Sequence, residues 1–397
     1  MKRPLEGIRV LDLSRVISGP FCSMVLADLG AEVIKFEKPG EGDMTRSNEP
    51  MYKGVSTYFM SYNRNKKSVT LNFRRPEAKE IFLELVKTAD VVVENYRAGT
   101  MEAMGLGYDV LSGINPKIVL TRISGFGQKG PYSNRTCFDG AAQSMGGLVD
   151  ITGEPDGSPY MAGTYVVDLG TSLYAAVGTV SALYEASKTG KGQVVDVALL
   201  DTAFSFLHTA IPDVKLVGQP FTRNGNNDRY MWPANIYPAK DGKWVYIHAG
   251  MERCYRDIMN VIGHPEVLED KLHGATREAR ASKEGKEYND KLIAEWTQTK
   301  TPEEVVDAIA NLGIPCAKVN TAAEAMEDPQ LRLRGMIQEY DMDGRRGVCS
   351  GSPIHFSESE FSVYMAPPDL GEHTNEVLES LGYSAERIAE LKEKGAV

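Results

Sequence analysis

The sequence has few cysteines and histidines, and neither residue type is spaced for metal binding. The five cysteines form no C-x-x-C pair, and the six histidines are dispersed, with no H-x-x-x-H pair and no cysteine nearby at ligand spacing. Zinc sites and disulfide frameworks need such spacings, so we expect neither. The odd number of cysteines favours free thiols in a reducing compartment.

A long apolar run and an excess of basic residues are also missing. The start, MKRPLEGIRV, reaches acidic and glycine residues before any stretch long enough for a signal peptide, and no later run approaches the roughly 20 apolar residues of a membrane span. We therefore expect a cytoplasmic protein with no membrane partner. The 54 acidic and 44 basic residues give a net charge of −10, which repels nucleic acid. No nucleic-acid partner is expected, and an anionic ligand needs a local basic pocket.

Familiar catalytic motifs are absent or stand in the wrong context. No G-x-S-x-G elbow and no G-x-x-x-x-G-K-[ST] loop occurs, which argues against α/β-hydrolase and P-loop chemistry. GFGQKG at 125–130 matches the dinucleotide motif G-x-G-x-x-G, but the turn-rich stretch PYSNRT follows it instead of a helix. We therefore do not predict a nicotinamide enzyme.

The chain does contain the pattern of a large α/β protein. Its 397 residues, 42% of them hydrophobic and 25% charged, suffice for about two or three domains. In the first third, strand-like apolar runs at 7–14, 31–37, 68–73, 90–96 and 117–124 alternate with helical patterns at 19–30 and 76–89. This alternation is typical of βαβ units, so we predict a Rossmann-like, doubly wound sheet that is mainly parallel.

One aspartate stands between two apolar runs. Asp168, in YVVDLGTS, follows the run 161–167 and precedes the longer run 169–186. Aspartate is among the best helix N-caps and stabilises a helix by about 1 kcal/mol in that position. From the residues alone, a cap is the ordinary interpretation and a catalytic carboxylate is the alternative.

Seven segments, taken in order along the chain, resemble those of the family III CoA-transferases. They are LEGIRVLDLSRVISGPF, LADLGAEVIKFEKPGEGD, NRNKKSVTLNF, ADVVVENYRAG, SGFGQKGP, TGKGQVVDVALLD and APPDLGEHTNEVLESLGY. Formyl-CoA transferase and carnitine CoA-transferase belong to that family. Seven segments in the right order are far more specific than any one of them, and they cover nearly the whole chain.

The resemblance implies a two-domain chain and an interlocked homodimer. Its large Rossmann-like, CoA-binding domain would take 1–188, followed by a linker over 189–224 and a smaller α+β domain over 225–325. Residues 326–397 would form a return linker and the C-terminal part of the large domain. An acyl-CoA thioester and a small carboxylic acid would be the substrates, with no tightly bound cofactor and no metal.

The resemblance also gives Asp168 a catalytic role. An aspartate at this position would attack the acyl-CoA carbonyl to form a mixed anhydride, and the released CoA thiolate would then form an aspartyl-CoA thioester. Attraction by the helix dipole would lower the pKa of Asp168, so that the carboxylate would need no separate base.

The CoA contacts follow from the same family positions. Val16 and Ile17 would line the entry, Lys38 would face the phosphoadenosine, and Arg135 would lie near the pyrophosphate. The nucleotide wall would consist of Leu71, Asn72, Arg74, Asn95, Tyr96 and Arg97, and Asp139 is included among the contacts. Arginine and lysine suit phosphates by charge, and arginine also by bidentate geometry.

A flap over 223–233 would cover the acyl group and supply backbone N–H donors for the oxyanions. It would act through Gly225, Asn226, Asn227, Tyr230 and Trp232. The flap keeps one glycine where formyl-CoA transferase is glycine-rich, and Asn48 stands where that enzyme has a bulky aromatic residue. Both departures indicate another acyl substrate. The alternative for Trp232 is a buried anchor in the small domain.

Two other functions remain open. The α-methylacyl-CoA racemases resemble this chain as well, but they use a histidine base where Phe138 stands here, and a phenyl ring cannot accept a proton. A non-catalytic acyl-CoA-binding protein would keep the CoA contacts but would not need Asp168.

Overall fold

The computed structural model describes residues 3–342 and 344–397, which form two compact units. Unit 1 contains the chain up to Leu148, Met161–Pro212 and Gln330–Val397, and unit 2 contains Val149–Tyr160 and Asp213–Pro329. The expected linker over 189–224 is wrong for 189–212, because strand β8 (Val194–Ala198) pairs with β7 (Val119–Ser124) inside unit 1. The segment 149–160, expected in the large domain, belongs to unit 2.

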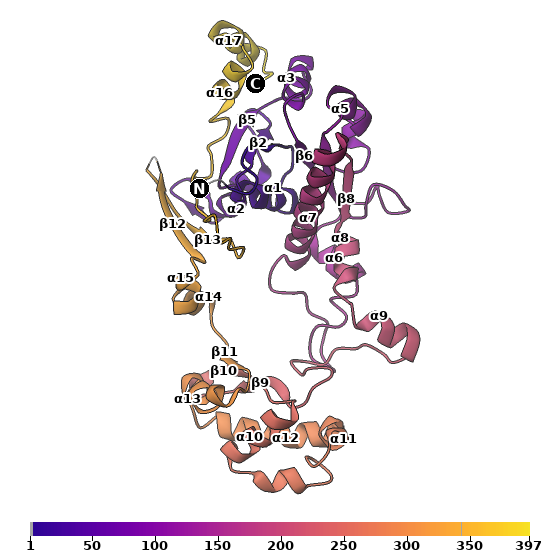
Figure 1. Cartoon of the computed structure of the whole chain (residues 1–397), viewed down its shortest axis with the longest axis vertical. Helices are drawn as coiled ribbons and strands as arrows, with labels where there is room; N and C mark the ends of the chain where they lie inside the picture. The colour runs from indigo at the N-terminus through magenta and orange to yellow at the C-terminus, as the bar shows by residue number, and fades with distance from the viewer. Residues whose placement is uncertain (1–2, 343) are drawn as a thin grey trace. The chain divides into compact units, whose positions relative to one another are not determined.

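Unit 1 is built on a six-stranded parallel sheet. Besides β7 and β8, its strands are β1 (Arg9–Asp12), β2 (Glu32–Glu37), β5 (Lys66–Thr70) and β6 (Val91–Glu94). They are arranged in the order β5-β2-β1-β6-β7-β8 (Figure 1). Counted along the chain, this is the order of the doubly wound Rossmann-like fold. The predicted parallel sheet is confirmed.

Helices cover both faces of the sheet, because its strands are apolar on both sides. On β1, Val10 packs in the core that contains α1 (Ser18–Asp28) and α7 (Val166–Thr189), and Leu11 packs in the core that contains α3 (Pro76–Val86). The C-terminal helices α16 (Thr374–Ser380) and α17 (Ala385–Glu393) join the α3 core. Both chain ends therefore contribute to unit 1.

Helix α7 is long and apolar enough to cross a membrane by length and composition, so the expectation that no run is long enough is wrong for Val166–Thr189. The helix contacts α1, β7, β8 and α8 (Leu199–Ser205), and 44% of its most apolar window is buried. A core helix meets the same two criteria, so the finding alone does not indicate a membrane.

The remaining elements of unit 1 are short. They are β3 (Met51–Tyr52), β4 (Val55–Ser56), α2 (Thr57–Tyr62), α4 (Thr100–Ala103), α5 (Tyr108–Ile114), α6 (Asp139–Met145), α9 (Ala210–Pro212), α15 (Pro329–Leu333), β12 (Ile337–Met342) and β13 (Arg345–Ser350). The pairs β3–β4 and β12–β13 are antiparallel hairpins.

Unit 2 has a three-stranded antiparallel sheet with helices around it. Its strands are β9 (Ala234–Pro238), β10 (Trp244–His248) and β11 (Cys316–Lys318), and its helices are α10 (Glu252–Ile262), α11 (Arg277–Ala281), α12 (Lys283–Thr297), α13 (Pro302–Ile309) and α14 (Ala322–Met326). Tyr237, Tyr255 and Ile293 lie at the centre of a separate apolar core.

Candidate active site

The strand order of unit 1 reverses between β1 and β6, and a loop leaves each strand at that point. One loop contains Arg15–Ile17 and the other contains Asn95–Arg97. In open α/β sheets, ligands bind outside the carboxyl ends of the strands at such a reversal. Two pockets lie here, and both are lined by Arg15 and Tyr96.

The first, which we call the Asp168 pocket, has a volume of about 280 Å³. It combines a carboxylate with three arginines and several apolar side chains. Its lining includes Asp168, Arg15, Arg97, Arg135, Val16, Ile17, Ser18, Met44, Asn95, Tyr96, Cys137 and Phe138. The second, which we call the Lys38 pocket, has a volume of about 330 Å³ and is lined by Lys38, Leu71, Asn72, Phe73, Arg74 and Thr100, among others.

The structure brings most of the predicted CoA contacts together in these two pockets. Val16, Ile17, Asn95, Tyr96, Arg97 and Arg135 line the Asp168 pocket, and Lys38, Leu71, Asn72, Arg74 and again Tyr96 line the Lys38 pocket. The residues are far apart in the chain but follow β1, β2, β5, β6 and β7, whose carboxyl ends share one edge of the sheet.

Arg15 is a functional candidate that the sequence analysis missed. Its guanidinium carbon lies 5.1 Å from the centre of the Tyr96 ring, and both residues line both pockets. Asn95 fixes the Arg15 backbone with two hydrogen bonds, accepting from its N–H at 2.8 Å and donating to its carbonyl at 2.6 Å. The one signal in the sequence that could have identified Arg15 is its position, as a basic residue in the loop after the first strand.

The helix that carries Asp168 is capped by a different aspartate. Tyr165 precedes the first turn of α7, so Asp168 is the third residue of the helix and not its N-cap. Asp139 Oδ1 instead accepts hydrogen bonds from the N–H groups of Val167 at 2.8 Å and Asp168 at 2.9 Å. The interpretation of Asp168 as a cap is therefore wrong.

Asp139, which is predicted to contact CoA, is not among the described residues that line the two pockets. Its side chain is buried against the first turn of α7, where it replaces a local N-cap. Gln143 donates to its other oxygen and accepts from the N–H of Ala162 at 3.0 Å. Asp139 thus supports the helix that presents Asp168.

Asp168 is only 8% exposed, and burial raises the pKa of its carboxyl to about 7. The like charge of Asp139 contributes to this rise in pKa, and the nearby Ser18 hydroxyl opposes it. The predicted lowering of the Asp168 pKa is therefore wrong. At neutral pH about half of the carboxyl groups carry a charge.

Two serines connect the first turns of α1 and α7. The Ser172 hydroxyl lies 2.6 Å from the carbonyl oxygens of both Ser18 and Asp168. Ser18 lines the same pocket as Asp168. The sequence analysis missed both serines, because no local pattern indicates that Ser18 and Ser172, 154 residues apart in the chain, are in contact.

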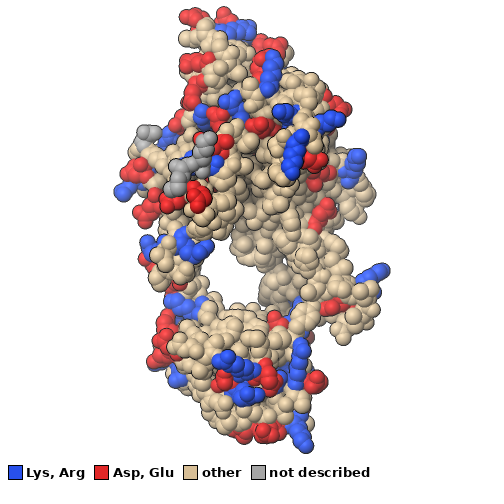
Figure 2. Space-filling model, viewed as in Figure 1, with Lys and Arg blue, Asp and Glu red and all other residues tan. Residues whose placement is uncertain are grey.

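The cations around the two pockets have weak or replaceable partners. Arg97 donates to the Thr136 hydroxyl at 2.6 Å, Arg135 lies over the Tyr132 ring at 4.1 Å, and Lys38 forms an exposed ion pair with Glu41. Exposed pairs contribute little stability, so an anionic ligand could replace these contacts at small cost. On the face drawn in Figure 2, described basic and acidic side chains are interspersed, and the basic groups that matter are local to the pockets.

The residues expected near the acyl group are divided between the two units. Asn48 is exposed behind a 3-10 turn (Met44–Ser47), and Met44 of that turn lines the pocket instead. The expected flap belongs to unit 2. There Gly225 has a φ of +57° and donates to the Gly153 carbonyl at 2.9 Å, and the Tyr230 hydroxyl donates to Asp213 at 2.8 Å.

Three further flap residues are attached to the same unit. Asn226 is exposed, and the Asn227 carbonyl accepts from the Asn224 side chain at 2.9 Å. Lys286 Nζ lies 3.9 Å from the centre of the Trp232 ring. These contacts favour the interpretation of Trp232 as an anchor within unit 2.

Comparison with known proteins agrees with this geometry. Residues 5–374 match the family model described as CoA-transferase family III. The chain is 35% identical over 398 residues to succinyl-CoA–D-citramalate CoA-transferase of Chloroflexus aurantiacus, covering 100% of this chain and 98% of that protein. It is 35% identical over 421 residues to formyl-CoA:oxalate CoA-transferase of Rhodopseudomonas palustris, covering 100% of this chain and 98% of that protein.

A solved structure has the same fold. The crystal structure of a CAIB/BAIF family protein from Brucella suis superposes with a TM-score of 0.86 at 34% sequence identity, covering 96% of this chain and 100% of that one.

Proposed function

Because the chain belongs to family III of the CoA-transferases, we propose that it transfers CoA to a free carboxylic acid through intermediates bound to Asp168. The chain is an enzyme of the CoA-transferase type. The mechanism rests on one observation: the Asp168 carboxyl is nearly buried, has no cation paired with it in the described structure, and faces a pocket with three arginines.

The first half of the reaction moves CoA onto the protein. An Asp168 oxygen attacks the thioester carbon, the C–S bond breaks, and CoA leaves as a thiolate while a mixed anhydride forms. The thiolate then attacks the carboxyl carbon of Asp168 and expels the original acyl group as a carboxylate. An aspartyl-CoA thioester remains.

The second half reverses these steps with a new acid. The acceptor carboxylate attacks the Asp168 carbonyl and expels CoA thiolate, which gives a second anhydride. The thiolate attacks the acceptor's acyl carbon and releases Asp168 as a carboxylate. One thioester is exchanged for another, so no ATP is needed.

The charge of Asp168 makes the reaction depend on pH. Only the ionised carboxylate is a nucleophile, and burial raises the pKa of this group to about 7. We therefore expect kcat/KM to rise with pH through about 7. Burial also removes hydrating water from the carboxylate, which leaves it more nucleophilic than a solvated aspartate.

The substrates are proposed from the named relatives. One of them acts on succinyl-CoA and D-citramalate, and another on formyl-CoA and oxalate. The arginines at the Asp168 pocket suit a second carboxylate as well as phosphates. Succinyl-CoA and formyl-CoA as donors, with dicarboxylic acids as acceptors, are the pairs to try first.

The racemase alternative lacks its histidine base in the pocket. Phe138 lines it with 64% of its surface exposed, and no histidine is among its described lining residues. A phenyl ring cannot transfer a proton. A non-catalytic binding protein would leave the unpaired, nearly buried Asp168 without a purpose.

The partner that we propose is a second copy of this chain in an interlocked homodimer. Along α7, apolar side chains are exposed at helical spacing, namely Leu173, Tyr174, Val177, Val180 and Tyr184, and Val177 is 65% exposed. Such an exposed apolar stripe supports an interface between protein chains. Light scattering should give a dimer at all dilutions, and differently tagged subunits should exchange very slowly. A monomer that forms on dilution would contradict this.

Mass spectrometry of the protein with the donor alone tests the mechanism. The peptide that contains Asp168 should gain the mass of CoA less water, and hydroxylamine should convert Asp168 to a hydroxamate only when donor is present. Asp201 is the matched control, because it is an exposed aspartate in the first turn of α8. An unlabelled Asp168 with a donor that supports turnover would rule the mechanism out.

A further inference from the structure

The loop between β1 and α1 contains a residue in an unfavourable backbone conformation. Val16 has a φ of +71° and lines the Asp168 pocket. Left-handed conformations bring Cβ close to the backbone, and a β-branched residue is a clear outlier there. Among the described residues, the other non-glycine positions with positive φ are Lys53, Asn65 and Asp241, none of them β-branched. Surrounding groups must therefore hold Val16 in place.

Asp43 is the group that holds it. The Val16 N–H donates to both carboxylate oxygens of Asp43, at 3.2 and 3.4 Å. Asp43 is paired with Lys35 at 3.0 Å, and both side chains are fully buried. Lys35 also donates to the Ser14 carbonyl at 2.8 Å. One buried ion pair thus fixes the loop on both sides of Arg15.

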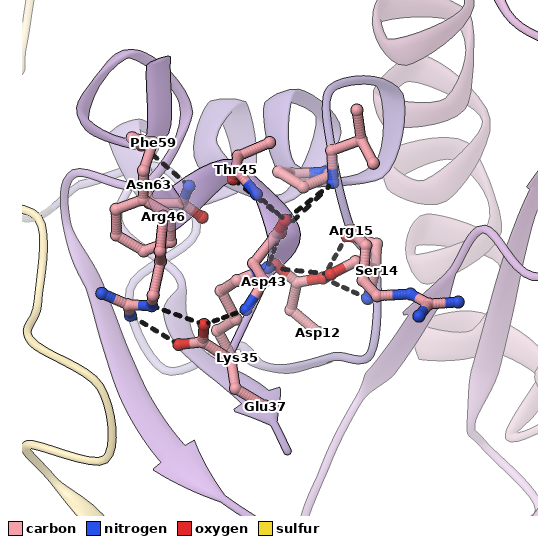
Figure 3. Close-up of polar contacts among 12 residues, drawn as sticks. Asp12, Ser14, Arg15, Lys35, Glu37, Asp43, Thr45, Arg46, Phe59 and Asn63 are labelled. Atoms are coloured by element: carbon pink, nitrogen blue, oxygen red, sulfur yellow. Dashed lines mark hydrogen bonds and ion pairs between the residues drawn. The ribbon is translucent and has the colours of Figure 1, made fainter. Parts of the chain in front are cut away.

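Further hydrogen bonds fix the Asp43 backbone and the loop beside the ion pair. Asp43 donates its N–H to Glu37 at 2.9 Å, and Arg46 binds both oxygens of Glu37 at 2.6 and 2.7 Å. Asp12 accepts from the Ser14 N–H at 2.9 Å. Figure 3 shows these side chains converging on Asp43, whereas the guanidinium of Arg15 points away from them.

Stability alone does not account for such an arrangement. Apolar side chains of similar size often stabilise a core as well as a buried ion pair or better, because the charges lose their hydration. The ion pair of Lys35 and Asp43 supplies an acceptor for the Val16 N–H in a fixed direction, which apolar groups cannot do.

The conformation of Val16 decides where Ser18 points. Ser18 follows two residues later and lines the same pocket as Asp168. Its carbonyl accepts at 2.6 Å from the Ser172 hydroxyl, which also donates to the Asp168 carbonyl at 2.6 Å. The two ends of the loop are closely packed, because a Cβ built on Gly19 would lie 2.1 Å from the Ser14 Cβ, which leaves little room for the loop to move toward Ser14. A relaxed Val16 would therefore turn Ser18 away from Asp168.

We propose that Asp43 is a positioning residue for CoA transfer, which holds Val16 in the left-handed conformation so that Ser18 keeps its place beside Asp168, to which Ser172 links it. Asp43 touches no reacting atom in this role. The kinetic part of the inference rests on the proposed function, and the conformational part does not.

The test is a double-mutant cycle with Val16→Gly, because glycine adopts a positive φ without strain. Asp43→Asn should lower kcat about tenfold or more while the KM for acyl-CoA stays within about threefold. Asp43→Asn combined with Val16→Gly should recover most of this loss. The proposal would be overturned if the losses in kcat from Asp43→Asn and Val16→Gly were additive. It would also be overturned if Asp43→Asn lowered kcat equally with and without Val16→Gly.

Hydrogen exchange supplies a readout that does not need activity. Amides of 14–19 should exchange faster in Asp43→Asn than in the wild type and return toward wild-type rates when Val16→Gly is added. Unchanged exchange in Asp43→Asn would overturn the proposal. If the wild type transfers no CoA from any donor, the proposed function fails. Hydrogen exchange of the amides of 14–19 still decides whether Asp43 holds the loop.

Two further variants separate positioning from folding. Asp28→Asn breaks another buried pair, with Arg64 at 2.7 Å, at the far end of α1, and should leave kcat unchanged. Lys35→Met with Asp43→Leu removes the acceptor without leaving a buried charge, and should reproduce the kcat loss if Asp43→Asn does not fold. A normal kcat in this double variant would overturn the proposal.

Discussion

Two buried carboxylates of unit 1, Asp12 at the end of β1 and Asp168 in the first turn of α7, are in opposite electrostatic states. Burial raises the pKa of both, and Asp12 is the more deeply buried. Lys66, Lys35 and two serine hydroxyls nevertheless lower the pKa of Asp12 to about 2. The pKa of Asp168 rises to about 7, because its charged neighbour is Asp139.

The comparison shows that the neighbouring charges decide what a buried carboxylate can do. Asp12 is ionised but fully occupied, since Lys66 lies at 3.1 Å and Ser23 donates to it at 2.6 Å. Asp168 forms no ion pair with a described residue and lines an open pocket. A paired carboxylate stabilises the loop, and an unpaired one is available for chemistry.

The largest expected effect is on activity. Asp168→Asn should lower the rate of CoA transfer at least about a thousandfold, because an amide cannot form the anhydride. Initial rates with a donor that supports wild-type turnover are the measurement. Asp201→Asn, in the first turn of α8, should keep wild-type rates. Substantial turnover by Asp168→Asn would remove the difference between the two carboxylates.

Asp12 should show the opposite pattern, with a large effect on stability. Asp12→Ala leaves the fully buried ammonium of Lys66 without its partner, which should cost about 3–5 kcal/mol in the free energy of unfolding. Urea titration measures this. Glu32→Ala removes the partly exposed partner of Arg9 and Lys67 on the two neighbouring strands and should cost about 1–2 kcal/mol or less. Equal losses in the two variants would show that burial of the pair does not matter.

The pH dependence of stability should distinguish Asp168 from Asp12. Because the Asp168 pKa is raised from 3.8 to about 7 in the folded state, the unfolded chain releases this proton first and stability falls between about pH 4 and 7. Asp168→Asn removes that term, so it should match the wild type below pH 4 and exceed it by up to about 4 kcal/mol above pH 7. Urea unfolding at several pH values is the measurement. A constant difference would mean that the Asp168 pKa is not raised.

The smallest effect concerns the charge of Asp139. Asp139→Asn keeps an oxygen that can cap α7 but removes the negative charge, so the Asp168 pKa should fall and the acid limb of kcat/KM should move down by roughly one pH unit. The pH profile of the two enzymes measures this. An unmoved acid limb would mean that burial alone raises the Asp168 pKa.

Much of the architecture could be predicted from the sequence, because it depends on local patterns. Apolar strands that alternate with helical segments require a parallel sheet with helices on both faces. The strand ends then meet at one edge, which explains why Val16, Lys38, Asn72 and Arg97 lie in two pockets there. The resemblance added the identity of Asp168, which the residues alone left open.

What the sequence by itself determined is which elements form and which side chains reach the edge of the sheet, since hydrophobic period and chain order set both. Only the tertiary structure decided that Asp139 caps α7 from 29 residues away, that the Asp168 pKa rises instead of falling, and that Asp43 holds Val16. Each of these depends on a distance between groups far apart in the chain and on the water excluded around them. Those two quantities exist only once the helices have packed on the sheet.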